Sequence, residues 1–143
     1  MILAGTALRT YIVSELQSVL NPVPIYSVMP PDNVLKYVIV TGLGENDASP
    51  KNCFMTDGFI QIQVVEKFDK RDGDLDWVNT IASLISRTLC PTRQSKIGDE
   101  NGVNVFYIYI DSNAEALFDT DPGRTAVSSL RLRYMAQEGT PVT

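Results

Sequence analysis

Residues 58–66 read Gly58-Phe59-Ile60-Gln61-Ile62-Gln63-Val64-Val65-Glu66, and this stretch decides the fold. Ile60, Ile62 and Val64 fall on one face, and the two glutamines fall on the other. Alternation at period two with β-branched residues is typical of a half-buried strand. An acidic, glycine-containing turn over residues 69–74 follows, and apolar residues then recur at helical spacing from Trp77 to Leu89. The stretch 58–90 therefore predicts a strand, a polar loop and an amphipathic helix that packs back on the sheet.

Composition bounds the class of protein. At 143 residues we expect a single domain over residues 1–143, and a 44% apolar and 20% charged composition favours a globular chain over a disordered one. The net charge of −5 argues against a generic nucleic-acid or anionic-membrane surface. The chain has no histidine, so it lacks the commonest general base and the usual zinc ligand. We therefore expect no enzymatic activity and no cofactor.

The sequence also bears on the compartment of the protein. No segment is long and apolar enough for a signal peptide or a membrane span, so we expect synthesis in a reducing cytosol. Two cysteines are too few for a disulfide framework. We expect Cys90 to be a small core residue at the end of the second helix and Cys53 to be a loop thiol, with a disulfide between them as the less favoured alternative.

The remaining elements follow from periodicity and from turn residues. We expect a first helix over 3–20, which ends at Asn21-Pro22 because proline cannot continue the helix. The near-continuous apolar run over 36–42 predicts a strand that is buried on both faces and central in the sheet. Further strands are expected at 24–28, 103–110 and 125–136. The expected connections are the loops 44–56, 91–102 and 111–124, and residues 137–143 form a frayed tail.

This order predicts an α+β fold: a mainly antiparallel sheet of four to five strands with two helices packed on one face. The opposite face would then carry polar side chains, including Gln61, Gln63, Arg131 and Arg133. Such a face is either solvated or covered by another subunit.

The densest acidic cluster is Asp72-x-Asp74-x-Asp76, which begins like a calcium loop. The match then fails, because Trp77 replaces the glycine needed at the sixth position and Ser83 replaces the acid at the twelfth. We expect no metal site here. The simpler interpretation is that Asp74 or Asp76 caps the second helix.

Four residues are candidates for a subunit interface. Leu117 and Phe118 stand in polar surroundings of a predicted loop, where apolar residues either fold back on the body or bury against a partner. Arg131 and Arg133 alternate on the last strand, where they are either solvated or form ion pairs across an interface. Trp77, by contrast, is expected to anchor the second helix on the sheet.

The order of elements over residues 3–136 resembles the tail completion, or tail terminator, family of tailed bacteriophages. The resemblance rests on the helix from Ala7 to Leu20, the Pro24-Ile25-Tyr26 strand with its Pro30-Pro31 corner, and the strand Lys36–Val40. The strand Phe59–Val65 and the helix that starts at Trp77 continue it.

The resemblance implies a structural virion subunit that assembles into a hexameric ring at the head-proximal end of the tail. The ring would meet the tail tube protein and a head-completion or connector protein, and DNA would pass through it without specific binding. No catalytic residue, cofactor or membrane is implied. We expect the loops 44–56 and 111–124, with Leu117 and Phe118, to contribute to the interface. Two alternatives stay open: another head–tail connector or neck ring, and a small cytosolic enzyme or binding module that uses Asp72, Asp74 and Asp76.

Overall fold

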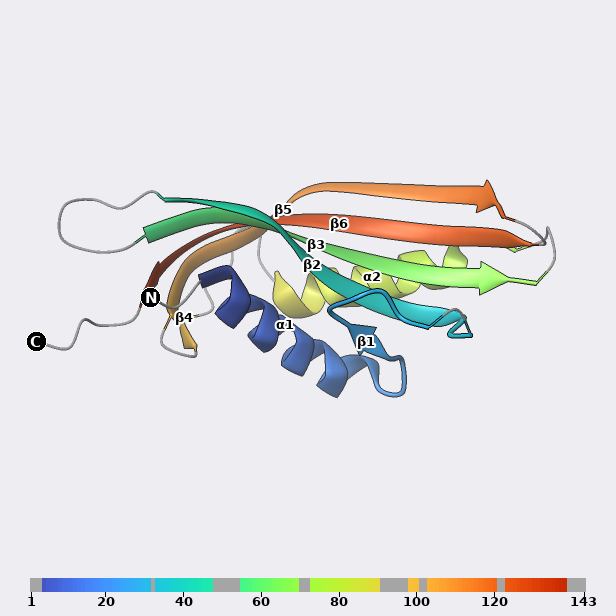
Figure 1. The fold of residues 1–143 in the computed structure, drawn as a ribbon, viewed down its shortest axis with the longest axis horizontal. Helices are drawn as coiled ribbons and strands as arrows, with labels where there is room; N and C mark the ends of the chain where they lie inside the picture. The colour runs from blue at the N-terminus through green and yellow to red at the C-terminus, as the bar shows by residue number, and fades with distance from the viewer. Residues whose placement is uncertain are drawn as a thin grey trace, which may run out of the picture.

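The computed structural model describes residues 4–31, 33–47, 55–69, 73–90, 98–100, 103–120 and 123–138. Two helices and six strands form one layered body (Figure 1). In chain order they are α1 (Ala4–Leu20), β1 (Ile25–Tyr26), β2 (Lys36–Asp47), β3 (Met55–Phe68), α2 (Asp76–Leu89), β4 (Gly98–Glu100), β5 (Val103–Asp119) and β6 (Arg124–Glu138).

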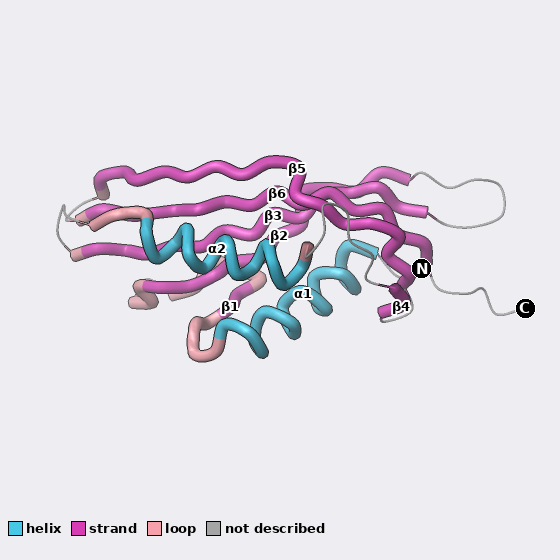
Figure 2. The backbone as a smooth tube through the Cα atoms, turned by 180° about the vertical axis from the view of Figure 1, so that it is seen from behind, coloured by secondary structure: helices cyan, strands magenta, loops and turns pink. Residues whose placement is uncertain are grey.

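The strands form one sheet in the order β1-β2-β3-β6-β5-β4. Only the two-residue β1 runs parallel to its neighbour, and the other four pairings are antiparallel. Both helices lie on the same face: α2 is behind the strands in Figure 1 and in front of them in Figure 2. The predicted α+β class and the placement of both helices on one face are confirmed.

The core lies between the helices and the face of the sheet that the sequence marks as apolar. Ile62 pairs with Val40 on one side and Leu130 on the other, and all three side chains are buried. From the helices, Ile12 and Ile85 enter the same core and are fully buried. The alternation in residues 58–66 therefore positions the core as predicted, and the glutamines point to the helix-free face.

Residues 37–40 of β2 are buried on both faces, as the apolar run predicts, but β2 is not central in the sheet. Its outer neighbour is only the two-residue β1, which pairs with Val38 and Ile39. On the helix-free face, Tyr37 and Ile39 are buried in a second small cluster with Tyr26, Val34 and others. The segment before β2 therefore supplies the cover that we had expected from neighbouring strands.

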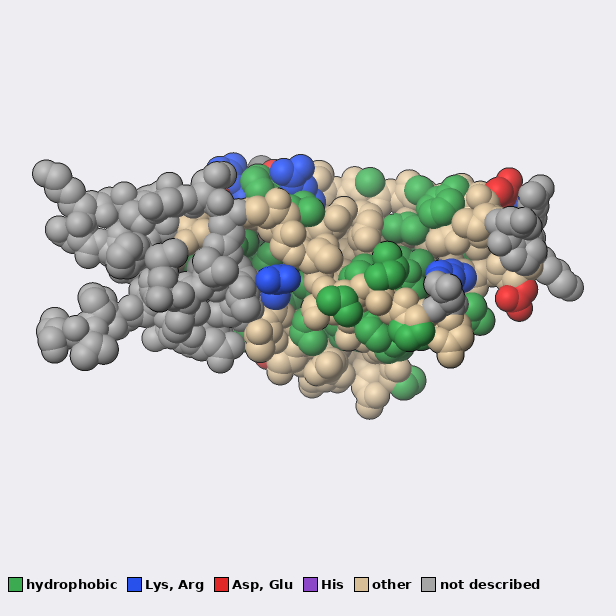
Figure 3. Space-filling model, viewed as in Figure 1, with side chains coloured by type: hydrophobic (Ala, Val, Ile, Leu, Met, Phe, Trp, Pro, Cys, Tyr) green, Lys and Arg blue, Asp and Glu red, His purple; other side chains and the backbone are tan. Residues whose placement is uncertain are grey.

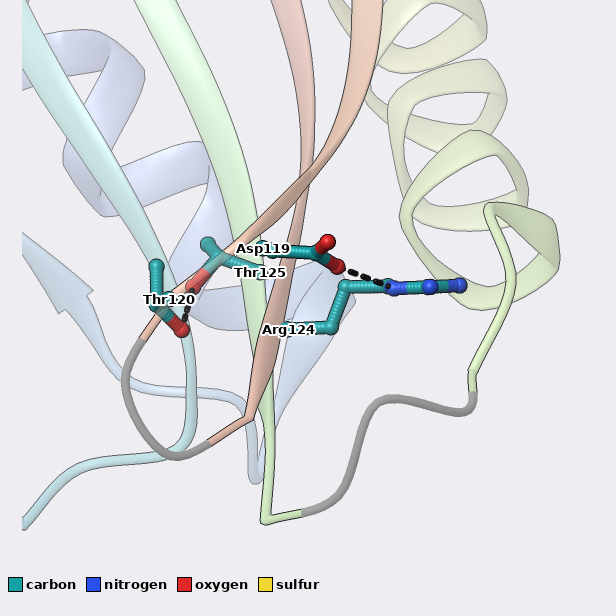
Figure 4. Close-up of polar contacts among 4 residues, drawn as sticks. All are labelled: Asp119, Thr120, Arg124 and Thr125. Carbon is teal, nitrogen blue, oxygen red and sulfur yellow. Dashed lines mark hydrogen bonds and ion pairs between the residues drawn. The ribbon is translucent and has the colours of Figure 1, made fainter.

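The prediction of a loop over residues 111–124 is wrong. β5 continues to Asp119 and pairs with β6 residue by residue down to Asp119 opposite Arg124. Figure 4 shows the facing ends of the two strands, where the Arg124 Nε lies 2.9 Å from Asp119 Oδ1 and the Thr120 and Thr125 hydroxyls lie 3.5 Å apart. Residues 111–119 are exposed on both faces, so they lack the apolar alternation that identifies a strand in a sequence.

Other bounds also shift. Both ends of the predicted loop 44–56 are strand, since β2 ends at Asp47 and β3 starts at Met55, and residues 48–54 lie outside the described part. The three-residue β4 falls inside the predicted loop 91–102. The tail that we expected to fray from residue 137 stays in β6 to Glu138, where it pairs with Val103. None of the described helices is long and apolar enough to cross a bilayer.

Candidate interaction surfaces

The helix-free face of the sheet carries a cluster of arginine and aromatic side chains. Arg131 and Arg133 lie opposite Gln61 and Phe59 of β3, as the alternation on β6 predicts. The guanidinium carbon of Arg131 lies 4.1 Å from the centre of the Phe59 ring, and that of Arg133 lies 5.6 Å from it. Stacking of this kind holds long cationic side chains flat against an aromatic face. We call these three residues with Asp57, Asp111, Tyr107 and Tyr109 the arginine cluster.

Arg133 is held by a two-point ion pair. Its Nε and Nη2 donate to the two carboxylate oxygens of Asp57 at 3.2 and 2.8 Å. The hydrogen bond from Arg133 lowers the pKa of Asp57, and the hydrogen bonds to Asp57 and then to Tyr109 raise the pKa of Arg133. Burial raises the pKa of the neighbouring Tyr107. The pair is bidentate and stacked, so it fixes the arginine more firmly than a single contact would.

Arg131 makes a looser ion pair. Its Nε lies 3.8 Å from Asp111 Oδ2, and both side chains are more than a third exposed. Asp111 is an extra residue of β5, since the register between β5 and β6 shifts between Ile110 and Ser112. Both candidate arginines thus pair inside their own subunit. Ion pairs across an interface remain a prediction.

Leu117 and Phe118 do not join the arginine cluster. The register places Leu117 on the helix side of β5 and Phe118 on the helix-free side, with exposures of 37% and 47%. Phe118 lies opposite Thr125, six residues along β6 from Arg131, which corresponds to about 20 Å. These two apolar residues have not folded back on the body. They mark the exposed end of β5.

The outer edge of β5 is open over most of its length. Within the described residues, β4 pairs only with Val103–Val105 of β5. Beside this edge, on the helix side, a groove of about 460 Å³ runs between α2 and β5. Its apolar floor is Ala82, Ile110 and Leu130, and its walls are polar. The wall residues are Asn79, Ser83, Ser86, Arg87, Asn113, Glu115 and Ser128.

One hydrogen bond ties the two walls of this α2–β5 groove together. Asn79 Nδ2 of α2 donates to Glu115 Oε2 of β5 at 2.6 Å. Neither residue stands out in the sequence, because they lie 36 positions apart and meet only through the fold. The sequence therefore gives no local signal for this groove.

The opposite edge of the sheet carries exposed apolar side chains, which we call the apolar loop: Val28, Met29 and Leu35. Val28 is 70% and Met29 is 75% exposed, the highest values among the large hydrophobic residues described. In Figure 3, hydrophobic side chains gather over this β1–β2 side of the molecule. Our sequence reasoning missed the loop. Its one local signal is an apolar Val28-Met29 pair directly before the double proline, in a corner that should be polar.

The acidic cluster acts at a helix start. Asp74 Oδ1 accepts the backbone N–H of Asp76 at 3.0 Å, so Asp74 satisfies one of the free N–H groups at the start of α2. Asp72 lies outside the described residues. Among the residues that the structure describes, no group of three carboxylate, cysteine or histidine side chains is placed to hold a metal ion.

Trp77 anchors α2 as predicted. The ring is half-buried and packs against the core, and the Lys36 ammonium lies 5.0 Å from its centre. Lys36 also pairs at 3.0 Å with Glu66, whose carboxylate is buried. The pairing keeps that buried charge compensated.

Cys90 is a free thiol at the end of α2, partly buried against the core as expected. Its Sγ lies 3.9 Å from the Ile108 carbonyl oxygen, and burial raises its pKa to about 11. Cys53 lies outside the described residues.

Comparison with known proteins supplies the fold but no sequence family. No protein-family model matches the sequence, and no curated protein sequence matches it. Among solved structures, the chain is similar to one from the "Virion of native gene transfer agent (GTA) particle", with a TM-score of 0.66 and 14% identity. The match covers 96% of this chain and 99% of that chain. This chain therefore shares the complete fold of a protein that is part of a virion particle.

Proposed function

We propose that this protein is a structural subunit of a phage-like virion, and more specifically a tail terminator. It would form a ring at the head-proximal end of the tail tube and join tail to head. The observation that carries the proposal is the shared fold with a chain of a gene transfer agent virion over nearly the full length of both chains. The order of elements that resembles tail terminators supports the finer assignment.

The surfaces of the subunit fit a role in assembly. The apolar loop and the end of β5 expose apolar side chains at opposite edges of the sheet. A closed ring needs a heterologous interface, in which two different patches of one subunit meet. We propose that the exposed Leu117 and Phe118 lie in that interface. We further propose that the protein is not an enzyme.

The helix-free face suits a surface along which DNA moves without being retained. Its two arginines are each paired with a carboxylate, Asp111 or Asp57, so the cluster carries little net positive charge. Affinity for nucleic acid comes mainly from unpaired basic side chains that neutralise phosphates. We propose that this face lines the passage of the ring.

Native mass spectrometry over a range of protein concentrations tests the ring. We expect a six-subunit species that grows at the expense of the monomer as the concentration rises. The place in the virion is tested separately, by adding the purified protein to tails that lack a terminator. Tails that then join heads support the proposal. A protein that binds only to isolated heads would instead be another head–tail connector.

A further inference from the structure

The strand β5 has two parts that differ in burial. From Tyr107 to Ile110 its side chains are buried or half-buried, whereas every residue from Asp111 to Asp119 is exposed. We call residues 111–119 the strap. We propose that the strap opens from β6 as a unit while the rest of the subunit stays folded. The inference goes beyond the proposed function, and it places the exposed Leu117 and Phe118 on a segment that moves without unfolding of the body.

The strap has one neighbouring strand. It pairs with β6 from Ser112 opposite Arg131 to Asp119 opposite Arg124. On the other side of β5, the described residues place only β4, which does not reach the strap, and Figure 1 shows this part of β5 at the free edge of the sheet. None of the strap side chains belongs to the hydrophobic clusters of the described residues. Segments with few buried apolar contacts are those that open locally in a folded protein.

The strap begins at a point where the pairing with β6 is already interrupted. The register shifts between Ile110 and Ser112, and Asp111 is the extra residue. A bulge leaves its extra residue unpaired and disrupts the ladder locally. The Asp111 carboxylate lies 3.8 Å from the Arg131 Nε, which is a loose contact, whereas Ile108 on the other side of the bulge is fully buried. The bulge therefore sets a limit at which the opening stops.

Side-chain contacts hold the strap only at exposed positions. Glu115 accepts a hydrogen bond from Asn79 of α2 at 2.6 Å, and Asp119 accepts one from the Arg124 Nε at 2.9 Å. Both contacts are exposed. Contacts of this kind stabilise a structure only slightly, because water and salt screen them and because ordering long side chains costs entropy. They position the strap, and the hydrogen bonds to β6 supply most of what keeps it closed.

The strand β6 is held independently of the strap. It pairs with β3 along its whole other side, and Ala126 and Leu130 are buried in the core between the sheet and the helices. Opening of the strap therefore frees hydrogen-bonding groups on one edge of β6 and leaves the other edge paired. This difference between the two edges gives the opening a distinctive experimental signature.

Hydrogen exchange of single backbone amides tests the strap. It is measured by mass spectrometry with electron-transfer fragmentation, at low concentration where the monomer prevails. Successive amides of a central antiparallel strand point alternately to its two neighbours. Between Thr125 and Leu130 we therefore expect every second amide of β6 to exchange on the order of a hundredfold faster than those between them, with similar rates because one opening frees them all. From Leu132 to Met135, where β6 pairs with the buried part of β5, we expect no alternation.

A reversible crosslink supplies the matched control. Ala114→Cys and Ser129→Cys place two thiols directly opposite each other, because these residues pair in the register. The native thiols are removed by Cys53→Ser and Cys90→Ala, and circular dichroism establishes that the protein is folded in both redox forms. The oxidised form ties the strap to β6, so the alternation along β6 should disappear. The reduced form of the same protein should exchange as the wild type does.

The other outcomes overturn the proposal in distinguishable ways. Uniform protection from Thr125 to Met135 shows that the strap does not open on its own, and alternation that continues through Leu132 to Met135 shows that all of β5 opens. Exchange rates that fall steadily with distance from Arg124 show fraying from the end of the strand. Alternation that persists in the oxidised form shows that opening of the strap is not its source. A wild type that stays monomeric at every concentration counts against the self-assembled ring alone, since the strap is measured on the monomer.

Discussion

Ile62→Ala tests which face of the sheet is the core, and with it the side on which the arginine cluster lies. Ile62 is fully buried between Val40 and Leu130. The change removes three carbons, worth about 0.8 kcal/mol each, or about 2.4 kcal/mol. Incomplete collapse of the cavity raises the loss of unfolding free energy to about 3–4 kcal/mol. For a chain of 143 residues this corresponds to a fall in Tm of roughly 10 °C.

The assay is urea denaturation of the wild type, Ile62→Ala and the adjacent control Gln63→Ala. Gln63 is half-buried on the helix-free face, and its Nε2 reaches the Ser129 hydroxyl only at 3.5 Å. We expect the control to change the unfolding free energy by no more than about 0.5 kcal/mol. An equal or larger loss for Gln63→Ala would refute the reasoning, because a register shifted by one residue exchanges the two faces.

Three further predictions follow from local contacts. Gly58→Ala should lower the unfolding free energy by about 1–3 kcal/mol in urea denaturation, because the Cβ of the new alanine would lie 2.6 Å from the hydroxyl of the buried Tyr134. An unchanged urea midpoint would contradict the close packing at this position. Asp57→Asn should lower stability by about 1 kcal/mol at pH 7. In the folded state the pKa of Asp57 is below its ordinary value of 3.8. The stability that the Asp57 carboxylate contributes is therefore present above pH 3.8 and is lost as pH falls through the folded-state pKa, so the Tm values of the wild type and the variant should converge at low pH. A difference in Tm that stays constant with pH would exclude the ion pair with Arg133 as its source. With the other cysteine replaced, Cys90 should react with iodoacetamide at pH 8 on the order of a hundredfold more slowly than glutathione, because its pKa is about 11; equal rates would show that the thiol is accessible and ionised.

The elements that can be predicted from the sequence are those that bury only one face. Ile60, Ile62 and Val64 alternate because the helices cover only one side of β3, and the same rule places Arg131 and Arg133 on the other side. The period of the side chains carries this information locally, so no knowledge of the partner elements is needed.

The missed features depend on contacts between distant parts of the chain. β5 beyond Ile110 is exposed on both faces, so nothing imposes an alternating pattern on it. The partner of Arg133 is Asp57, which lies 76 residues away in the sequence. β6 has a neighbouring strand on each side, β3 and β5, and either could have supplied that partner. Likewise, the segment before β2 buries Tyr37 and Ile39, and the sequence pattern does not distinguish this cover from that of a strand central in the sheet.

The open edge of β5 carries features that protect it from pairing with other chains. A long unpaired edge is a template for indiscriminate pairing between chains, and natural proteins protect such edges with charges and β-bulges. β5 has both: its register against β6 shifts twice, and Asp111, Glu115 and Asp119 stand along its exposed half. These devices disfavour pairing of one β5 edge with another, since like charges would then face each other.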